Sequence, residues 1–300
     1  MTQSVRVRAP GKVNLYLAVG AREPDGYHPL ATVFQAVDVY EDVTATRSDR
    51  LELVLTGRGS DLPVDDTNLA IRAARLLAAH AGVEPRAHLA IHKRVPVAGG
   101  MAGGSADAAG TLVALDRLWG LRLPPVTLRQ LAAQLGADVP FCLMGGTAMG
   151  TSRGDVLTPV LARGHYTWLV ITQRSGLSTP RVFRAFDDAA TRRHVPPPAV
   201  DARFLRALAE GDTMFVGMNA RNDLAAPALS LHSGAQQVAE ACAHLALPTI
   251  VSGSGPTIMV LCESDEAAHS LGAYICEHTG AEDAFVAHGP VPGAHVVDET

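Results

Sequence analysis

The sequence has few cysteines and no long apolar run. The four cysteines are scattered without a CxxC pair: Cys142, Cys242, Cys262 and Cys276. We therefore expect buried free thiols, and neither disulfides nor a zinc site. No window approaches the run of ~18 uncharged apolar residues that a membrane helix needs, and the first ten residues lack the apolar stretch of a signal peptide. These absences predict a cytoplasmic protein.

A block of basic residues is also missing. The net charge of −5 is spread along the chain, whereas a nucleic-acid-binding surface needs clustered Lys and Arg. We expect no nucleic-acid partner, no membrane partner, and a monomer or weak homodimer that binds small anionic molecules. With 47% apolar residues in a chain of 300, the composition predicts a compact globular protein, and the length favours two moderate domains over one large one.

The hydrophobic pattern predicts strands and helices in mixed order. Apolar and polar residues alternate over residues 5–17 and 51–55, as they do in half-buried strands. Apolar residues with helical spacing occur in the middle of the chain and again in its second half. The remaining predicted elements are strands near 88–92, 168–172 and 248–262, helices near 104–119, 180–188, 201–210 and 234–245, and an exposed turn at 194–199.

Two helix boundaries have recognisable end signals. Asp66, Thr67 and Asn68 offer N-cap oxygens to a helix that we expect to end at Gly82. Thr127 and Gln130 have the spacing of a capping box and predict a second helix that stops at Gly136.

The strongest chemical signal is the glycine-rich segment 96–105 (PVAGGMAGGS). Four glycines among seven residues allow several backbone N–H groups to converge on an anion, and the helix that follows adds its positive end. A glycine cluster is also typical of plain turns. It is not a P-loop, because Ser105 and Ala106 stand where Lys and Ser or Thr are required, and it lacks the GxGxxG spacing of a dinucleotide fingerprint.

A lysine, an amide and a carboxylate form the second signal. Lys12 and Asn14 lie two residues apart in an alternating strand, so their side chains point to the same face. Asp138 is predicted on a tight turn between a helix end and an apolar run. Taken separately, these are typical of an exposed edge lysine and of ordinary turn chemistry. If Lys12 approaches Asp138, the ammonium keeps the carboxylate ionised, as phosphoryl transfer to an alcohol requires.

Three further segments are less specific. Residues 24–28 (PDGYH) form a turn that presents an aromatic ring beside an imidazole, followed by a strand with Phe34. Such a pair could stack on a base, although a hairpin turn explains it equally well. Residues 252–257 (SGSGPT) form another flexible group of N–H donors. His88 and His92 share a strand face without a metal-binding pattern.

Taken in order, these segments resemble the GHMP kinases, the superfamily of galactokinase, homoserine kinase, mevalonate kinase and phosphomevalonate kinase. Within it they are most similar to the family of 4-diphosphocytidyl-2-C-methyl-D-erythritol kinases of non-mevalonate isoprenoid biosynthesis. The resemblance implies a two-domain α+β fold with domains at 1–158 and 159–300 and the active site in the cleft between them. It spans most of the chain and rests on residues 10–17, 24–28, 96–109, 135–140 and 252–256.

The resemblance also implies a reaction and roles for residues. The reaction is transfer of phosphate from ATP to the 2-hydroxyl of a cytidine diphosphate-linked polyol, with Mg²⁺ bridging the β- and γ-phosphates. Asp138 would be the general base, and Lys12 would orient the hydroxyl. His28 would read the cytosine and Tyr27 would stack on it. The implied substrate-binding residues are Asn14, Tyr27, His28, Phe34, Thr179 and Phe183.

For ATP, the resemblance implies two contacts near the nucleoside and a loop around the phosphates. The nucleoside contacts are Asn68 and Lys93. The loop residues are Pro96, Val97, Ala98, Gly99, Gly100, Met101, Ala102, Gly103, Gly104 and Ser105, with Ser105 nearest to magnesium. Two positions depart from the family. Ala102 stands where relatives commonly have glycine and fits if it keeps an ordinary backbone angle, and Ala106 lacks a hydroxyl that many relatives have.

Two alternatives to this function remain. A related kinase could act on mevalonate, homoserine or a sugar, but Tyr27, His28 and Phe183 would then have no base to contact. A nucleotide-binding regulator without activity would not need both Lys12 and Asp138.

Overall fold

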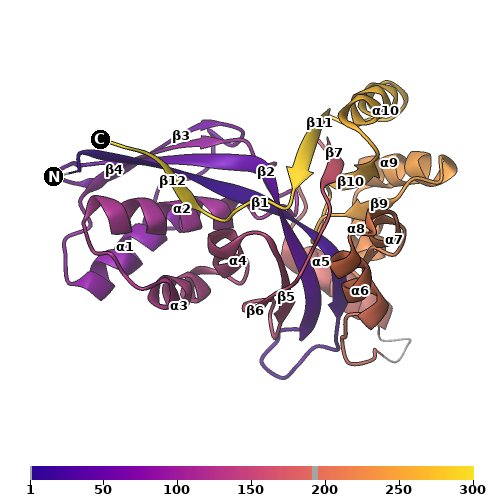
Figure 1. Ribbon diagram of the computed structural model, residues 1–300, viewed down its shortest axis with the longest axis horizontal. Helices are drawn as coiled ribbons and strands as arrows, with labels where there is room; N and C mark the ends of the chain where they lie inside the picture. The colour runs from indigo at the N-terminus through magenta and orange to yellow at the C-terminus, as the bar shows by residue number, and fades with distance from the viewer. Residues whose placement is uncertain (1, 191–194) are drawn as a thin grey trace.

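The chain folds into two β-sheets flanked by helices, which confirms the α+β class (Figure 1). The computed structural model describes residues 2–190 and 195–300. The first sheet and its helices form one half of the molecule, on the left in Figure 1, and the second sheet forms the other half with its own helices.

The first sheet is built around two long antiparallel strands. Its order is β12-β1-β2-β4-β3, while β5 pairs with β2 and β6, and β8 pairs with β1. Val5 and Val7 are buried whereas Arg6 is exposed, as the alternating pattern predicts. The strands are β1 (Ser4–Val19), β2 (Leu30–Thr46), β3 (Leu51–Gly57), β4 (Ala87–Lys93), β5 (Thr147–Thr151), β6 (Val156–Pro159), β8 (Arg221–Asn222) and β12 (His295–Glu299).

Four helices belong to the first half of the molecule. They are α1 (Leu69–Ala81), α2 (Gly103–Leu118), α3 (Pro125–Leu135) and α4 (Val139–Met144). α2 lies against β1 and β2, and its Leu112 and Leu115 are completely buried together with Leu89 of β4. The same helix therefore carries both core residues and the glycine-rich loop at its start.

The second sheet has the order β11-β7-β10-β9, and all of its pairs are antiparallel. Its strands are β7 (Tyr166–Thr172), β9 (Thr249–Val251), β10 (Ile258–Cys262) and β11 (Asp283–Gly289). The helices of this half are α5 (Thr179–Ala190), α6 (Ala202–Glu210), α7 (Thr213–Met218), α8 (Ala225–Leu231), α9 (Ser233–His244) and α10 (Asp265–His278).

The two predicted helix starts have different outcomes. Asn68 caps α1, since its side chain accepts a hydrogen bond from the backbone N–H of Ala70, and Gly82 ends the helix in a left-handed conformation. The capping box at Thr127 and Gln130 is wrong. α3 already begins at Pro125 with no side-chain cap, because a proline at the first helical position needs no N–H partner and its fixed φ suits a helix.

The two halves are joined by strands as well as by a linker. The predicted boundary at 158/159 falls at the end of β6, and the division into two domains stays a prediction. β12 returns from the second half to pair with β1. On β11, His288 contacts Asp38 of β2 at 3.0 Å and Asp265 of α10 at 2.9 Å.

Two further predictions concern particular segments. Of the predicted turn 194–199, residue 194 lies outside the described residues, and the rest has no regular structure. In the described ranges, 2–190 and 195–300, no helix is both long and apolar enough to cross a membrane.

Candidate active site

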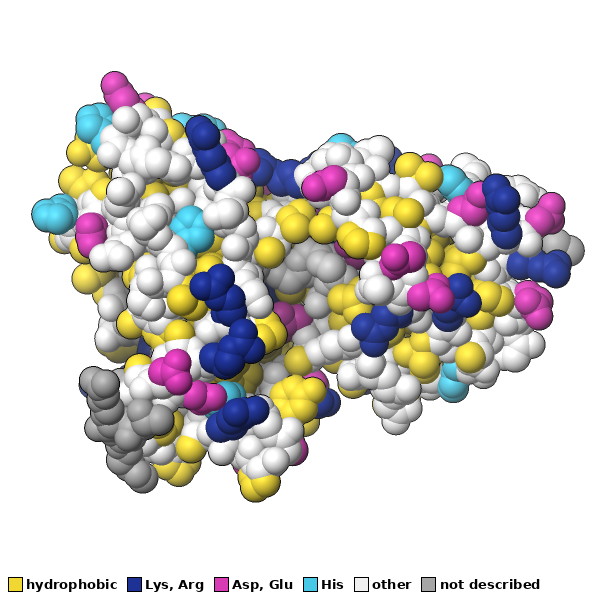
Figure 2. Space-filling model, turned by 180° about the vertical axis from the view of Figure 1, so that it is seen from behind, with side chains coloured by type: hydrophobic (Ala, Val, Ile, Leu, Met, Phe, Trp, Pro, Cys, Tyr) yellow, Lys and Arg dark blue, Asp and Glu magenta, His cyan; other side chains and the backbone are white. Residues whose placement is uncertain are grey.

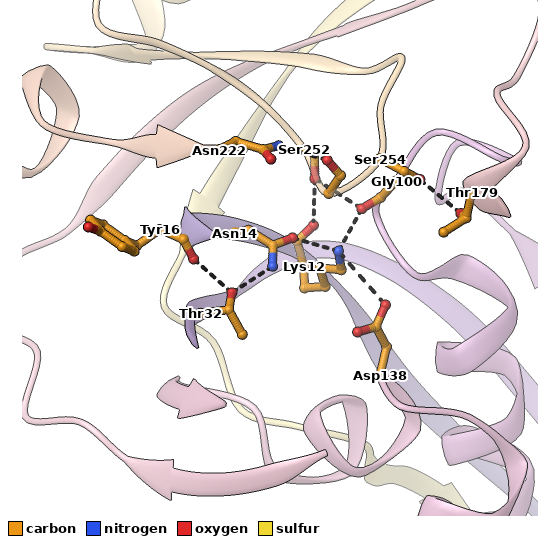
Figure 3. Close-up of polar contacts among 11 residues, drawn as sticks. Lys12, Asn14, Tyr16, Thr32, Gly100, Asp138, Thr179, Asn222, Ser252 and Ser254 are labelled. Carbon is orange, nitrogen blue, oxygen red and sulfur yellow. Dashed lines mark hydrogen bonds and ion pairs between the residues drawn. The ribbon is translucent and has the colours of Figure 1, made fainter. Parts of the chain in front are cut away.

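Lys12 and Asp138 meet in space although they are far apart in the sequence (Figure 3). Lys12 comes from the middle of β1, and Asp138 lies on the turn between α3 and α4. Lys12 Nζ is 3.8 Å from Asp138 Oδ2. The Asp138 side chain makes no helix-capping hydrogen bond and is 34% exposed. Its carboxylate is therefore open to a bound ligand, beside a lysine that is only 4% exposed.

A chain of hydrogen bonds fixes the direction of the Asn14 amide. Asn14 Nδ2 donates to Thr32 Oγ1 at 2.8 Å, and Thr32 Oγ1 donates to the Tyr16 carbonyl at 2.7 Å. The Asn14 oxygen is therefore turned toward Lys12, whose Nζ donates to it at 2.7 Å. This confirms that Lys12 and Asn14 share one face of the strand.

The glycine-rich loop is anchored to both halves of the molecule. The carbonyl oxygen of Gly100 accepts hydrogen bonds from Lys12 Nζ at 2.8 Å and from Ser252 Oγ at 3.2 Å (Figure 3). Gly100 has a φ of +83°, and a Cβ there would overlap the carbonyl oxygen of Ser252. Only glycine fits this position, so the two glycine-rich segments at 96–105 and 252–257 form one structural unit.

Two alanines in this loop adopt left-handed backbone conformations. Ala98 has a φ of 50° and Ala102 a φ of 63°. The condition under which alanine was expected to fit at position 102, an ordinary backbone angle, is not met. Ala102 is the N-cap residue of α2, with φ and ψ of 63° and 33° and no side-chain capping hydrogen bond. A left-handed alanine costs roughly 1–2 kcal/mol.

One cavity of about 840 Å³ collects most of the predicted site residues. It opens as the hollow seen between the two halves in Figure 2. The predicted residues that line it are Lys12, Asn14, Tyr27, His28, Phe34, Pro96, Ala98, Gly99, Gly100, Ala102, Gly103, Gly104, Ser105, Asp138, Thr179 and Phe183. Its size suits a nucleotide-sized ligand.

Four predicted residues do not line the cavity: Asn68, Lys93, Val97 and Met101. Asn68 is occupied as the cap of α1, and its Nδ2 donates to the Pro63 carbonyl at 2.8 Å. Lys93 is 3% exposed and surrounded by carboxylates. Met101 is fully buried, whereas Val97 is exposed outside the cavity.

Aromatic side chains gather at one end of the cavity. His28 stacks on Phe183 with ring centroids 4.9 Å apart, and Tyr27 is 56% exposed. His28 Nε2 lies 2.7 Å from Asp187 Oδ1. The guanidinium of Arg153 lies 5.1 Å from the centre of the Tyr27 ring. This end offers flat surfaces together with hydrogen-bonding groups, as a nucleobase requires.

Four charged residues of the cavity wall were not among the residues predicted from the motifs. They are Arg22, Arg153, Arg184 and Asp187. Asp187 follows Phe183 by four residues in a predicted helix, so helical spacing could have placed it on the same face. The arginines supply the positive charge that an anionic ligand needs.

Cys142 lies near the site, but its burial keeps the thiol unreactive. It lies one helical turn after Asp138, and its N–H donates to the Asp138 carbonyl at 3.1 Å. Complete burial raises the pKa of the Cys142 thiol, and the charge of Asp138 raises it further. The thiol therefore stays neutral and is part of the core, as predicted for a buried free cysteine.

Comparisons with known proteins agree with this geometry. Residues 68–146 match the family model described as the GHMP kinases N terminal domain. The chain is 49% identical to a protein of Mycolicibacterium smegmatis named 4-diphosphocytidyl-2-C-methyl-D-erythritol kinase, over 99% of this chain and 93% of that protein. The chain belongs to this kinase family. A family member with the same name from a Nocardioides species is 49% identical over 97% of this chain and 99% of its own.

A solved structure supports the family's fold as well. The crystal structure of a 4-(cytidine 5'-diphospho)-2C-methyl-D-erythritol kinase is 32% identical, with a TM-score of 0.74. It covers 95% of this chain and 99% of that chain. The GHMP kinase fold predicted from the motifs is therefore confirmed.

Proposed function

We propose that the protein transfers the γ-phosphoryl group of ATP to the 2-hydroxyl of 4-diphosphocytidyl-2-C-methyl-D-erythritol. The observation that carries the proposal is the meeting of three groups in one cavity. Lys12 Nζ lies 3.8 Å from the Asp138 carboxylate and 2.8 Å from the carbonyl of Gly100 in the glycine-rich loop. A base, a cation and a ring of backbone donors are the parts that phosphoryl transfer to an alcohol uses.

Asp138 acts as the general base in this proposal. It accepts the proton of the substrate hydroxyl while the hydroxyl oxygen bonds to the γ-phosphorus. The bond from that phosphorus to the β,γ-bridging oxygen breaks, and ADP leaves. Lys12 places a positive charge beside the Asp138 carboxylate and orients the hydroxyl together with Asn14, whose oxygen accepts a hydrogen bond from Lys12 Nζ.

The phosphates of ATP lie against the loop in this proposal. The first N–H groups of α2, at Gly103, Gly104 and Ser105, have no partner within the helix, and they lie at its positive end. Their glycines leave room for an anion to approach the backbone. These groups bind and align the triphosphate without taking part in a covalent step.

Mg²⁺ is a further part of the proposal. In phosphoryl-transfer sites this ion is usually held by one or two protein oxygens together with phosphate oxygens. The Ser105 hydroxyl lines the cavity and is a suitable donor. Within residues 2–190 and 195–300, no group of three or more His, Cys, Asp or Glu could hold a metal. Mg²⁺ would therefore bind with ATP and neutralise phosphate charge.

The aromatic end of the cavity would hold the cytidine. Tyr27 and Phe183 offer ring faces to the base, and His28 offers a hydrogen bond whose direction is fixed by Asp187. Thr179 and Phe34 complete the walls.

We also propose where the enzyme acts and in which oligomeric state. Because ATP and this acceptor are water-soluble, we propose that the enzyme acts in the cytoplasm. We further propose that it is a monomer or weak homodimer. Light scattering on the purified protein would test its oligomeric state.

An acceptor panel tests the function. The purified protein is incubated with ATP, Mg²⁺ and one of four acceptors: 4-diphosphocytidyl-2-C-methyl-D-erythritol, mevalonate, homoserine or galactose. We expect ADP release only with the first, and phosphorus NMR of the product should show a new phosphate ester at the 2-position. Turnover of another acceptor at an equal or higher rate would contradict the proposal, and ADP release without acceptor preference would favour a different role.

A further inference from the structure

Three charged side chains lie together in the core beneath the glycine-rich loop. Lys93 Nζ, at the end of β4, is 2.5 Å from Asp107 Oδ2 of α2 and 3.1 Å from Glu41 Oε1 of β2. All three residues are less than 5% exposed. Burying charges is expensive, and a hydrophobic cluster of the same volume is often as stable. Stability alone is therefore a weak reason for this cluster.

The cluster lies directly against the start of α2. A Cβ added to Gly103, the first residue of that helix, would be 3.1 Å from Glu41 Oε1. The other Glu41 oxygen accepts a hydrogen bond from the backbone N–H of Arg94 at 2.9 Å. Asp107 belongs to the next turn of α2. The network therefore connects the first two turns of the helix to β2 and to the end of β4.

Burial and mutual charge shift the pKa values of all three side chains, and one buried oxygen of the cluster, Asp107 Oδ1, has no hydrogen-bond partner among the described residues. Burial, and next the charge of Asp107, raise the pKa of Glu41 to about 8. Burial also raises the pKa of Asp107. Burial lowers the pKa of Lys93, but the negative charges of Asp107 and Glu41 raise it by more. The net effect is a raised pKa of the Lys93 ammonium. The Lys93 ammonium thus forms ion pairs with two carboxyl groups. The Cys142 thiol of α4 stays neutral, because burial and nearby negative charges raise its pKa.

We propose that Glu41, Lys93 and Asp107 are positioning residues that hold the first turns of α2, and with them the phosphate-binding N–H groups, without touching the nucleotide. Lys93 then supports ATP binding from below the loop instead of contacting the nucleoside. The proposal rests on the proposed function only in assigning ATP to the loop. It predicts that loosening the network weakens the use of ATP and leaves the acceptor site intact.

The test uses two substitutions that keep side-chain shape, Glu41→Gln and Asp107→Asn, in the full-length protein. We expect kcat/KM for ATP to fall roughly 10- to 100-fold, as a displaced binding group does, with the KM for the acceptor nearly unchanged. Asp116→Asn is the matched control: Asp116 lies near the other end of α2, where it accepts from the Leu123 N–H at 2.9 Å. This control should cost some stability but leave ATP kinetics unchanged.

Two measurements that need no acceptor distinguish a loss of position at the start of α2 from a general loss of protein stability. Calorimetry should show weaker binding of a non-hydrolysable ATP analogue to both variants. Amide hydrogen exchange should be faster at residues 106–110, whose N–H groups are the first with acceptors in or before the helix, but not at residues 113–118. Analogue binding and exchange equal to those of the control would overturn the proposal. Unfolding of both variants would overturn it too, because the network would then hold the whole first half. Either result leaves the acceptor panel on the wild-type protein unaffected.

Discussion

Replacing Asp138 by asparagine separates the proposed chemistry from the fold. Asparagine keeps the size of the side chain but cannot accept a proton at neutral pH. We expect kcat to fall by about 10²- to 10⁴-fold, the usual contribution of a general base, while the KM for ATP stays near its normal value. In the proposed site, ATP is held mainly by loop backbone groups that this substitution does not touch.

The structure also limits the expected change in stability. The Lys12–Asp138 pair is 3.8 Å apart, and Asp138 is one-third exposed, so the pair contributes less than ~1 kcal/mol by analogy with exposed ion pairs. Lys12 keeps its hydrogen bonds to Asn14 and Gly100 in the variant. The melting temperature should therefore fall by no more than about 2–4 °C.

The assay follows ADP release with saturating acceptor and, in parallel, thermal unfolding by circular dichroism. Asp201→Asn is the matched control, because Asp201 caps α6 through an oxygen that asparagine retains. The control should keep full activity. If Asp138→Asn turns over as fast as the control, Asp138 is not the base. If the Asp138→Asn variant unfolds instead, the Lys12–Asp138 ion pair contributes much more to stability than ~1 kcal/mol.

Three other predictions concern the backbone and the joint between the halves. Gly100→Ala should lower the free energy of unfolding by at least ~3 kcal/mol, whereas Gly82→Ala, with nothing within 4 Å of the new Cβ, should cost only ~1 kcal/mol; urea unfolding compares them. Ala102→Gly should stabilise the protein by less than ~1 kcal/mol, since relief of strain exceeds the added chain entropy, and a lower stability would contradict the strain. The hydrogen bond to Asp265 raises the pKa of His288, so its stabilisation is complete below an unfolded-state pKa near 6.5 and is lost as pH rises through the higher folded value. His288→Gln should flatten the fall in melting temperature above about pH 6.5, and an equal slope in both proteins would exclude this role.

Local rules were enough to predict the parts of the site that depend on neighbouring residues. The two-residue period of a strand placed Lys12 and Asn14 together, and the glycine spacing located the loop at the start of a helix. The same reasoning failed at Thr127, where the capping pattern competed with a proline two residues earlier. Short-range patterns identify an element more reliably than its first residue.

Contacts between distant segments could not be predicted from these patterns. The approach of Asp138 to Lys12 depends on how α3 and α4 pack beside β1, and the contact of Gly100 with Ser252 joins segments 152 residues apart. The left-handed angle of Ala102 is imposed by the loop around it, against the preference of alanine itself. In each case the contact or the backbone angle depends on tertiary packing and not on the neighbouring residues in the sequence.

The pairing of β12 with β1 has a consequence for biosynthesis. Residues 5–8 of β1 are translated long before residues 295–299, the strand that pairs with them along one edge. Until then β1 presents unpaired backbone groups to other nascent chains. A nascent chain should therefore be more prone to aggregation, and more dependent on chaperones, before residues 295–299 have been translated than after.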